Sequence, residues 1–128
     1  MSLLVLGTVA LDDVRTPSGF KKNMLGGSAS HFSMAARLFI RVELVSVVGS
    51  DFPKEYIRLF NTKGISTVSL MKEPGKTFHW CGEYKGDLNT ATTLNTELGV
   101  LPGFKPRITA FQKNIKNILK KKVVVLYP

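Results

Sequence analysis

The sequence has 128 residues, of which 44% are hydrophobic, and its 18 lysine and arginine residues against 9 aspartate and glutamate residues give a formal charge of +9. A chain of this length and composition is the size of one domain and can bury a core, which excludes a disordered protein. The single cysteine, Cys81, excludes an internal disulfide framework, and two histidines beside it are too few for a structural zinc site. We therefore expect a reducing, cytoplasmic location and no metal. The positive charge favours nucleic acid, an anionic membrane or a phosphorylated small molecule, without choosing among them.

The first 13 residues, MSLLVLGTVALDD, are mostly apolar. They lack the cationic start of a signal peptide, they reach Asp12 and Asp13 early, and they are too short to span a bilayer. Residues 3–6 form a compact apolar run that is typical of a buried strand. Residues 13–25 are polar and contain a proline and a glycine, so we expect an exposed loop or ribbon there.

Residues 23–40, NMLGGSASHFSMAARLFI, place Gly26 and Gly27 just before a predicted helix. Apolar residues recur at helical spacing over residues 30–40, and they include Phe32, Ala35, Ala36 and Phe39. The glycine pair serves either tight packing or the close approach of a ligand to the backbone. Because a short glycine motif is a weak signal, spacing alone favours packing. The nucleotide-binding patterns GxxxxGK[ST] and GxGxxG are both absent from the sequence.

Residues 42–49, VELVSVVG, are rich in β-branched residues and predict another strand. A helix is expected next, with Asp51 as its N-cap, Pro53 in its first turn and Gly64 at its end. The apolar stripe of this helix consists of Tyr56, Leu59 and Phe60.

Residues 65–71 and 76–84 predict two short strands with glycine-containing turns at their ends. Residues 87–106 are rich in Thr, Asn, Gly and Pro, and we expect them to be mostly loop. Helical spacing predicts a helix over residues 108–119, and residues 122–128, KVVVLYP, begin one more buried strand. Strands that alternate with helices predict an α/β fold with a mainly parallel sheet. Since such a strand is normally followed by a covering helix, the chain looks like the first portion of something longer.

The order and spacing of four stretches resemble the N-terminal part of the PfkB, or ribokinase-like, family of carbohydrate kinases. These stretches are VLGTVALDDV, GGSASHFSMAA, VELVSVVGSDFPKEYIRLFNTKGIST and PGKTFHWCGEY, and the resemblance extends over residues 3–127. It implies a partial ribokinase-like fold, in which a mainly parallel sheet with flanking helices carries a small β-sheet lid and the C-terminal half is missing. Residues 1–128 would form a single truncated domain with lid segments at about residues 13–25 and 76–94.

The resemblance implies a substrate site made of Asp12, Gly26, Gly27 and His31. Asp12 matches the family's acidic residue that binds sugar hydroxyls, which an ionised carboxylate accepts strongly. Asp13 is better suited to a strand-end or solvent-facing position. The glycine pair matches the family's Gly-Gly, where the missing Cβ lets the sugar touch the backbone. His31 stands where many members carry Asn, and its hydrogen bonds depend on tautomer and pH, so a core-facing or surface histidine is an equal alternative.

Three aromatic residues, Phe78, Trp80 and Tyr84, fall where the resemblance places a lid strand. Aromatic rings stack on the apolar face of a sugar, and they also pack ordinary sheets. The sequence leaves both interpretations open.

The family's GAGD-like motif, whose amides stabilise the transferring phosphate and whose aspartate acts as base, does not occur in this sequence. The resemblance therefore implies no catalytic residue and no cofactor in this chain, although ATP and magnesium are expected for the full-length family. We expect the chain to be the substrate-binding part of a sugar or nucleoside kinase and to be inactive by itself. Its expected partner is a small-molecule sugar or nucleoside.

Two alternatives remain. The charge suggests a basic module that binds nucleic acid or another polyanion, with lysines of the predicted C-terminal helix as contacts, namely Lys113, Lys116 and Lys120. A solvated helix face explains these lysines as well and is preferred, because no nucleic-acid motif accompanies them. The other alternative is structural, since an unfinished sheet would leave residues 123–126 to pair with a second copy or a missing half. No membrane partner is expected.

Overall fold

A computed structural model describes residues 2–107 and 121–126 of the chain and has two four-stranded sheets. The first sheet has the strand order β5-β4-β1-β8, and all its pairings are parallel. Its strands are β1 (Ser2–Leu6), β4 (Arg41–Gly49), β5 (Ser66–Glu73) and β8 (Lys121–Val125). The expected α/β fold with a mainly parallel sheet is confirmed. The helix predicted over residues 108–119 and its lysines lie outside the described residues.

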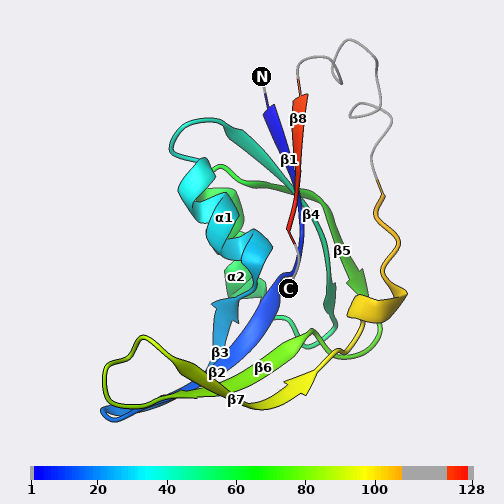
Figure 1. Cartoon of the computed structure of the whole chain (residues 1–128). Coiled ribbons are helices and arrows are strands. Elements are labelled where there is room, and N and C mark those ends of the chain that lie inside the picture. The colour runs from blue at the N-terminus through cyan, green and yellow to red at the C-terminus, as the bar shows by residue number, and fades with distance from the viewer. Residues whose placement is uncertain (1, 108–120, 127–128) are drawn as a thin grey trace.

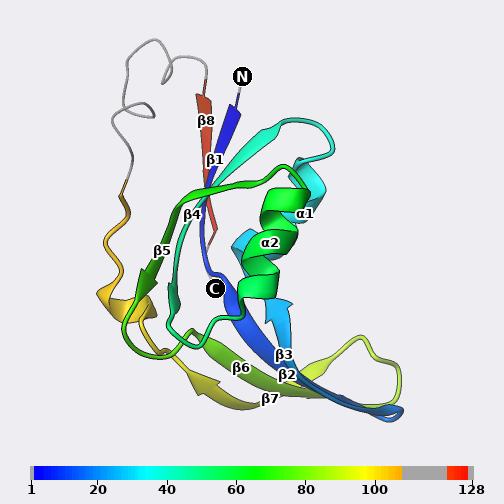
Figure 2. The same cartoon turned by 180° about the vertical axis from the view of Figure 1, so that it is seen from behind.

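Two helices, α1 (Ser28–Ala36) and α2 (Lys54–Thr62), cover one face of the first sheet, as Figures 1 and 2 both show. Residues 42–49 of β4 are buried throughout, as is typical of a central strand in a parallel sheet. Phe60 of α2 and Ala29 of α1 pack on the sheet and are fully buried. The core therefore lies between the helices and the first sheet.

The ends of α1 differ from the expected helix over residues 30–40. The helix begins at Ser28, and after Ala36 the chain turns, with the Phe39 amide donating to the Ala36 carbonyl oxygen at 2.9 Å. Phe39 is 89% exposed, so it does not belong to the packed face. The predicted helix was too long because Phe39, in the turn after the helix, also lies at helical spacing from the apolar residues before it.

The predicted α2 is confirmed, but its N-cap is Pro53 and not Asp51. Asp51 lies before the helix, and its carboxylate accepts hydrogen bonds from Thr77 instead. The end of the helix is as predicted, because Gly64 adopts a φ of +77° and its amide donates to the Asn61 carbonyl oxygen at 3.0 Å.

The second sheet has the strand order β3-β2-β6-β7 and lies below the helices in Figure 1. The β2–β3 and β6–β7 pairings are antiparallel, and the β2–β6 pairing is parallel. Its strands are β2 (Ala10–Thr16), β3 (Gly19–Gly26), β6 (His79–Tyr84) and β7 (Ala91–Glu97). The segments expected to form a lid, residues 13–25 and 76–94, fall largely within this sheet.

The expectation that residues 87–106 are mostly loop is wrong, because they include β7 and a 3-10 helix, η1 (Leu101–Gly103). Every residue of β7 is exposed, so the strand has no alternation of apolar and polar residues that would predict it. The strand β7 exists because its backbone pairs with β6.

A buried polar junction joins the two sheets where β4 ends and the chain leads into β6. The Gly49 amide donates to Oγ1 of Thr77 at 2.9 Å, and Thr77 donates from both its amide and its hydroxyl to Oδ1 of Asp51, at 2.8 and 2.7 Å. Gly75 accepts from the Ser50 amide at 2.9 Å. The VVGSD turn of the sequence thus fixes the position at which β6 begins.

The strand β8 ends the first sheet's strand order, next to β1. The predicted strand is present, but its predicted burial is wrong, because Val123 and Val125 are 60% and 51% exposed in the described structure. Neither described helix is long and apolar enough to cross a membrane.

Candidate functional site

Asp12 lies inside β2, the strand that follows the opening strand. The first strand ends at Leu6, and the chain turns before it enters β2 at Ala10. A Cβ atom at Gly26, on the neighbouring strand, would lie 2.0 Å from Oδ2 of Asp12. Gly26 is therefore required for the observed position of the Asp12 carboxylate, which occupies the place of a side chain there.

Gly27 is required for a different reason. It is the N-cap of α1 and has a φ of +94°, a conformation that residues with a side chain rarely adopt. A Cβ atom there would lie 2.2 Å from the carbonyl oxygen of Thr8, which accepts a hydrogen bond from the Ala29 amide at 3.0 Å. The glycine thus lets α1 begin directly against the chain between β1 and β2.

A cavity of about 290 Å³ lies at this place. It is lined by β2, the start of α1 and the chain around the start of β6, through Thr8, Ala10, Asp12, Gly27, Ser28, His31, Phe78 and Trp80. The carboxyl ends of the first sheet's strands point toward the second sheet (Figure 1), and open α/β sheets bind ligands at such ends. Of the four predicted site residues, Asp12, Gly27 and His31 line the cavity, while Gly26 lies against Asp12 without lining it.

Burial raises the pKa of the Asp12 carboxyl above its ordinary value; the nearby His31 and His79 oppose this rise, and Asp13 adds to it. Within the described part of the chain, no protein group donates a hydrogen bond to the Asp12 carboxylate. A half-buried carboxylate without a protein donor is a strong acceptor for a ligand's hydroxyl groups.

Asp13 has a different environment from its neighbour. The alternation of side chains along β2 places it on the opposite face of the sheet, where its Oδ1 accepts the Asn23 amide at 2.8 Å and lies 3.1 Å from Nε2 of His79. Burial would raise its pKa, but the Asn23 hydrogen bond, His79 and Lys22 outweigh burial and lower it. Asp13 therefore has protein partners, whereas Asp12 faces the cavity.

The aromatic residues of the expected lid strand divide between two positions. Phe78 and Trp80 line the cavity, and Tyr84 is not among its lining residues. The Trp80 indole donates to Oγ1 of Thr93 at 3.0 Å, and its ring occupies the space beside Gly82, where a Cβ atom would lie 2.0 Å from it. This fixed ring offers an apolar wall opposite the polar groups of α1.

Three lining residues were not expected from the sequence: Thr8, Ala10 and Ser28. They are small residues beside the predicted ones, so proximity to the aspartate and the glycine pair was the only signal that could have indicated them. In the described ranges, no cluster of three or more His, Cys, Asp or Glu residues has the geometry to hold a metal ion.

A larger cavity, of about 800 Å³, lies between β4, β5 and the chain around η1. It contains none of the predicted site residues. The smaller cavity is the candidate site, because the free carboxylate and the aromatic wall are there.

No family model matches the chain. The cytidine kinase of Thermococcus kodakarensis is 38% identical over 81 residues, which are 62% of this chain and 28% of that kinase. The chain thus spans less than a third of the length of this curated relative.

Solved structures of kinases have the same fold over most of the chain. A nucleoside kinase from Burkholderia thailandensis in complex with inosine superposes with a TM-score of 0.66 at 18% identity, covering 77% of this chain and 35% of that protein. A ribokinase from Cryptococcus neoformans var. grubii serotype A in complex with ADP gives a TM-score of 0.65 at 21% identity, covering 77% and 34%. The described chain therefore has part of the ribokinase-like fold, and its resemblance to the PfkB, or ribokinase-like, kinases is confirmed.

Proposed function

We propose that this chain is the substrate-binding part of a PfkB-type kinase and that the 290 Å³ cavity binds the sugar ring of a nucleoside or a free sugar. The observation that carries the proposal is the position of Asp12. Its carboxylate faces the cavity and accepts no hydrogen bond from the described residues, and the cavity is lined as well by Gly27, His31, Phe78 and Trp80.

Each lining group has a chemical task in this proposal. Asp12 accepts hydrogen bonds from two neighbouring sugar hydroxyls, and this fixes the orientation of the ring. His31 stands on the first turn of α1 and offers a ring nitrogen that donates or accepts, according to its tautomer. Phe78 and Trp80 cover the apolar face of the sugar or a base attached to it.

The size of the cavity and the relatives favour a small polyol. Small-molecule sites are usually about 300–1,000 Å³, so a cavity of 290 Å³ suits a single sugar ring with a modest substituent. A cytidine kinase and an inosine-bound nucleoside kinase are among the proteins that this chain resembles. These likenesses support a nucleoside as the ligand, and cytidine is the first compound to test.

Phosphoryl transfer is not expected from these 128 residues alone. The reaction depends on amides, cations and a base that stabilise the transferring phosphate, and the sequence has no GAGD-like motif to supply them. We expect the chain to bind its sugar or nucleoside without phosphorylating it. A coupled assay with ATP and magnesium that detects turnover would contradict this part of the proposal.

Trp80 is the single tryptophan of the chain, so its fluorescence reports directly on the cavity. We expect cytidine, inosine or D-ribose to change this fluorescence in a saturable manner. Asp12→Asn removes the charged acceptor and should weaken binding by about 10-fold or more, the value of hydrogen bonds to a charged group. The matched control is Asp87→Asn, an identical change in the turn after β6. No saturable change with any of the three compounds, or equal affinity of both variants, would refute the proposal.

A further inference from the structure

Asn23 is an unusual residue in the second sheet. The β2–β3 pairing shifts between Asp12, which pairs with Met24, and Val14, which pairs with Lys21. Asp13 therefore faces two residues of β3, and one of them, Asn23, has a φ of +53°. An extra residue in the left-handed conformation is a β-bulge, and such bulges often lie next to functional sites.

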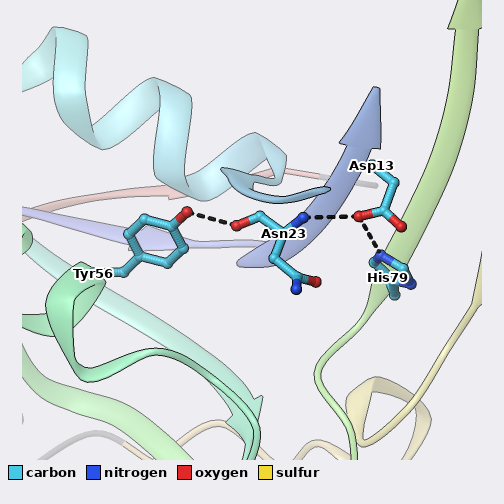
Figure 3. Close-up of polar contacts among 4 residues, drawn as sticks. All are labelled: Asp13, Asn23, Tyr56 and His79. Atoms are coloured by element: carbon cyan, nitrogen blue, oxygen red, sulfur yellow. Dashed lines mark hydrogen bonds and ion pairs between the residues drawn. The ribbon is translucent and has the colours of Figure 1, made fainter. Parts of the chain in front are cut away.

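The two backbone polar groups of Asn23 are bound from opposite sides (Figure 3). Its amide donates to Oδ1 of Asp13 at 2.8 Å, and its carbonyl oxygen accepts the Tyr56 hydroxyl at 2.5 Å. His79 approaches the same Asp13 oxygen at 3.1 Å, close enough for an ion pair when the imidazole is charged, although not aligned as a hydrogen bond. These four residues form the Asn23 cluster, which joins β2, β3 and β6 to α2.

Tyr56 connects this cluster to the core. It lies in the first turn of α2, and its ring packs on Phe52 with the ring centroids 5.7 Å apart. Phe52 is buried in the main core. The hydroxyl of Tyr56 thus extends from the rigid layer of the molecule to a strand of the exposed sheet.

The cluster is adjacent to the cavity along both strands. Asp13 follows Asp12 directly, so a movement of β2 at the cluster also moves the Asp12 carboxylate. Asn23 lies three residues before Gly26, against which that carboxylate packs. The position of Asp12 relative to His31 on α1 therefore depends on where the bulge is held.

We propose that Tyr56 and Asn23 are positioning residues for the ligand cavity. The Tyr56 hydroxyl fixes the bulge, and the bulge fixes the two strands that carry Asp12 and Gly26 against α1. This inference rests on the proposed function, since it assigns these residues to sugar binding in the same cavity. Neither Tyr56 nor Asn23 lines that cavity, so an effect of their substitution on affinity must pass through the strands.

The test is cytidine affinity, measured by Trp80 fluorescence on folded protein. Tyr56→Phe retains the ring on Phe52 and removes the hydroxyl, and we expect affinity to fall about three- to ten-fold, the value of one hydrogen bond. The control is Gly64→Ala, which strains the other end of α2, where a Cβ atom would meet nothing within 4 Å. This control should lower stability without lowering affinity, and equal affinity losses in the two variants would overturn the inference.

A second pair of variants tests the bulge itself. The recorded contacts of Asn23 use its backbone, so Asn23→Gly should retain the wild-type affinity because glycine adopts positive φ freely. Asn23→Ala removes the same side-chain amide as Asn23→Gly, but alanine resists the positive φ, and affinity should fall several-fold. Equal affinities for the two variants would overturn the role of the bulge. If the wild-type chain binds neither cytidine, inosine nor D-ribose, the proposed function fails and this inference fails with it.

Discussion

The two sheets of this protein are stabilised in different ways. In the first sheet, β4 is buried along residues 42–49, so its side chains are buried on both faces. In the second sheet, β7 is exposed throughout, and most of β3 is exposed as well. Hydrophobic burial therefore stabilises the first sheet, whereas backbone pairing and a few polar contacts determine the position of the second.

This difference explains where the candidate site lies. An exposed sheet moves more easily than a buried one, because it has fewer apolar contacts to lose. The cavity forms where such a sheet meets the rigid layer, and the polar contacts at the Thr77 junction and at Asn23 hold the two together. Substitutions in the first sheet should therefore change stability, and substitutions at the meeting points should change stability, ligand binding or both.

The largest expected effect is in the core of the first sheet. Leu44 of β4 is fully buried, and Leu44→Ala should lower the free energy of unfolding by about 3 kcal/mol because it leaves a cavity. The same change at Leu94 of β7, which is 48% exposed, should cost less than about 1 kcal/mol. Urea denaturation of both variants measures the contrast, and similar losses would show that the two sheets are not stabilised differently.

The next effect is at the junction between the sheets. Thr77→Val retains the shape of a fully buried side chain but removes the hydroxyl that binds Asp51 and Gly49. Leaving these partners unsatisfied should cost about 2 kcal/mol. Ser50→Ala is the control, since it removes an exposed hydroxyl that donates to Gly75 and should cost less than about 0.5 kcal/mol. A loss at Thr77 no greater than that at Ser50 would contradict the assignment of the junction.

The elements of the buried first sheet and its helices could be predicted from the sequence better than those of the exposed second sheet. Strands and helices of the buried layer have continuous or helical apolar patterns, so β1, β4, β5 and α2 could be predicted closely. β7 could not, because its polar residues form a strand only when β6 is available to pair with. Asp51 resembled an N-cap for a similar reason, since its true partner, Thr77, lies far along the chain.

For the candidate site, the sequence suggested a set of residues but not their geometry. The motifs indicated Asp12, the glycine pair and His31, and the structure brings three of them to one cavity. Gly26 is needed because of its contact with Asp12, and Gly27 because of its contact with Thr8. These contacts exist only once β2 pairs with β3 and α1 begins, so the sequence does not show them. The Asn23 cluster had no local signal, because Asn23 makes its contacts with backbone atoms and its partners lie far along the chain.

Gly26→Ala separates stability from binding at the meeting point of the sheets. Gly26 is outside the positive-φ region, so alanine fits the backbone, but its Cβ atom would displace the Asp12 carboxylate. We expect stability to change by less than about 1 kcal/mol, since alanine is preferred to glycine in a strand. Ligand affinity should fall about 10-fold, as expected for a displaced charged acceptor. Unchanged affinity in the Trp80 titration would show that Asp12 does not contact the ligand from its observed position.

The smallest effect concerns the two neighbouring aspartates. Because the folded-state pKa of Asp12 is raised by burial, its ionisation weakens the fold as pH rises through that pKa, and Asp12→Asn should raise stability at neutral pH. Asp13 behaves in the opposite way. Burial would raise its pKa, but the Asn23 amide, His79 and Lys22 outweigh burial and lower it. The stability that ionised Asp13 contributes is present above the ordinary aspartate pKa and is lost as pH falls through the lowered pKa of the folded state. Asp13→Asn should therefore reduce stability at neutral pH.

Urea denaturation of both variants between about pH 3 and pH 7 tests the sign of each effect. Both differences from the wild-type chain should shrink toward acid pH, where the two carboxyl groups become protonated. A shift of the same sign for both variants at neutral pH would remove the distinction between them. Opposite signs would mean that the acid facing the cavity costs stability, as expected for a group retained to bind a ligand, while its neighbour one residue later stabilises the sheet that carries it.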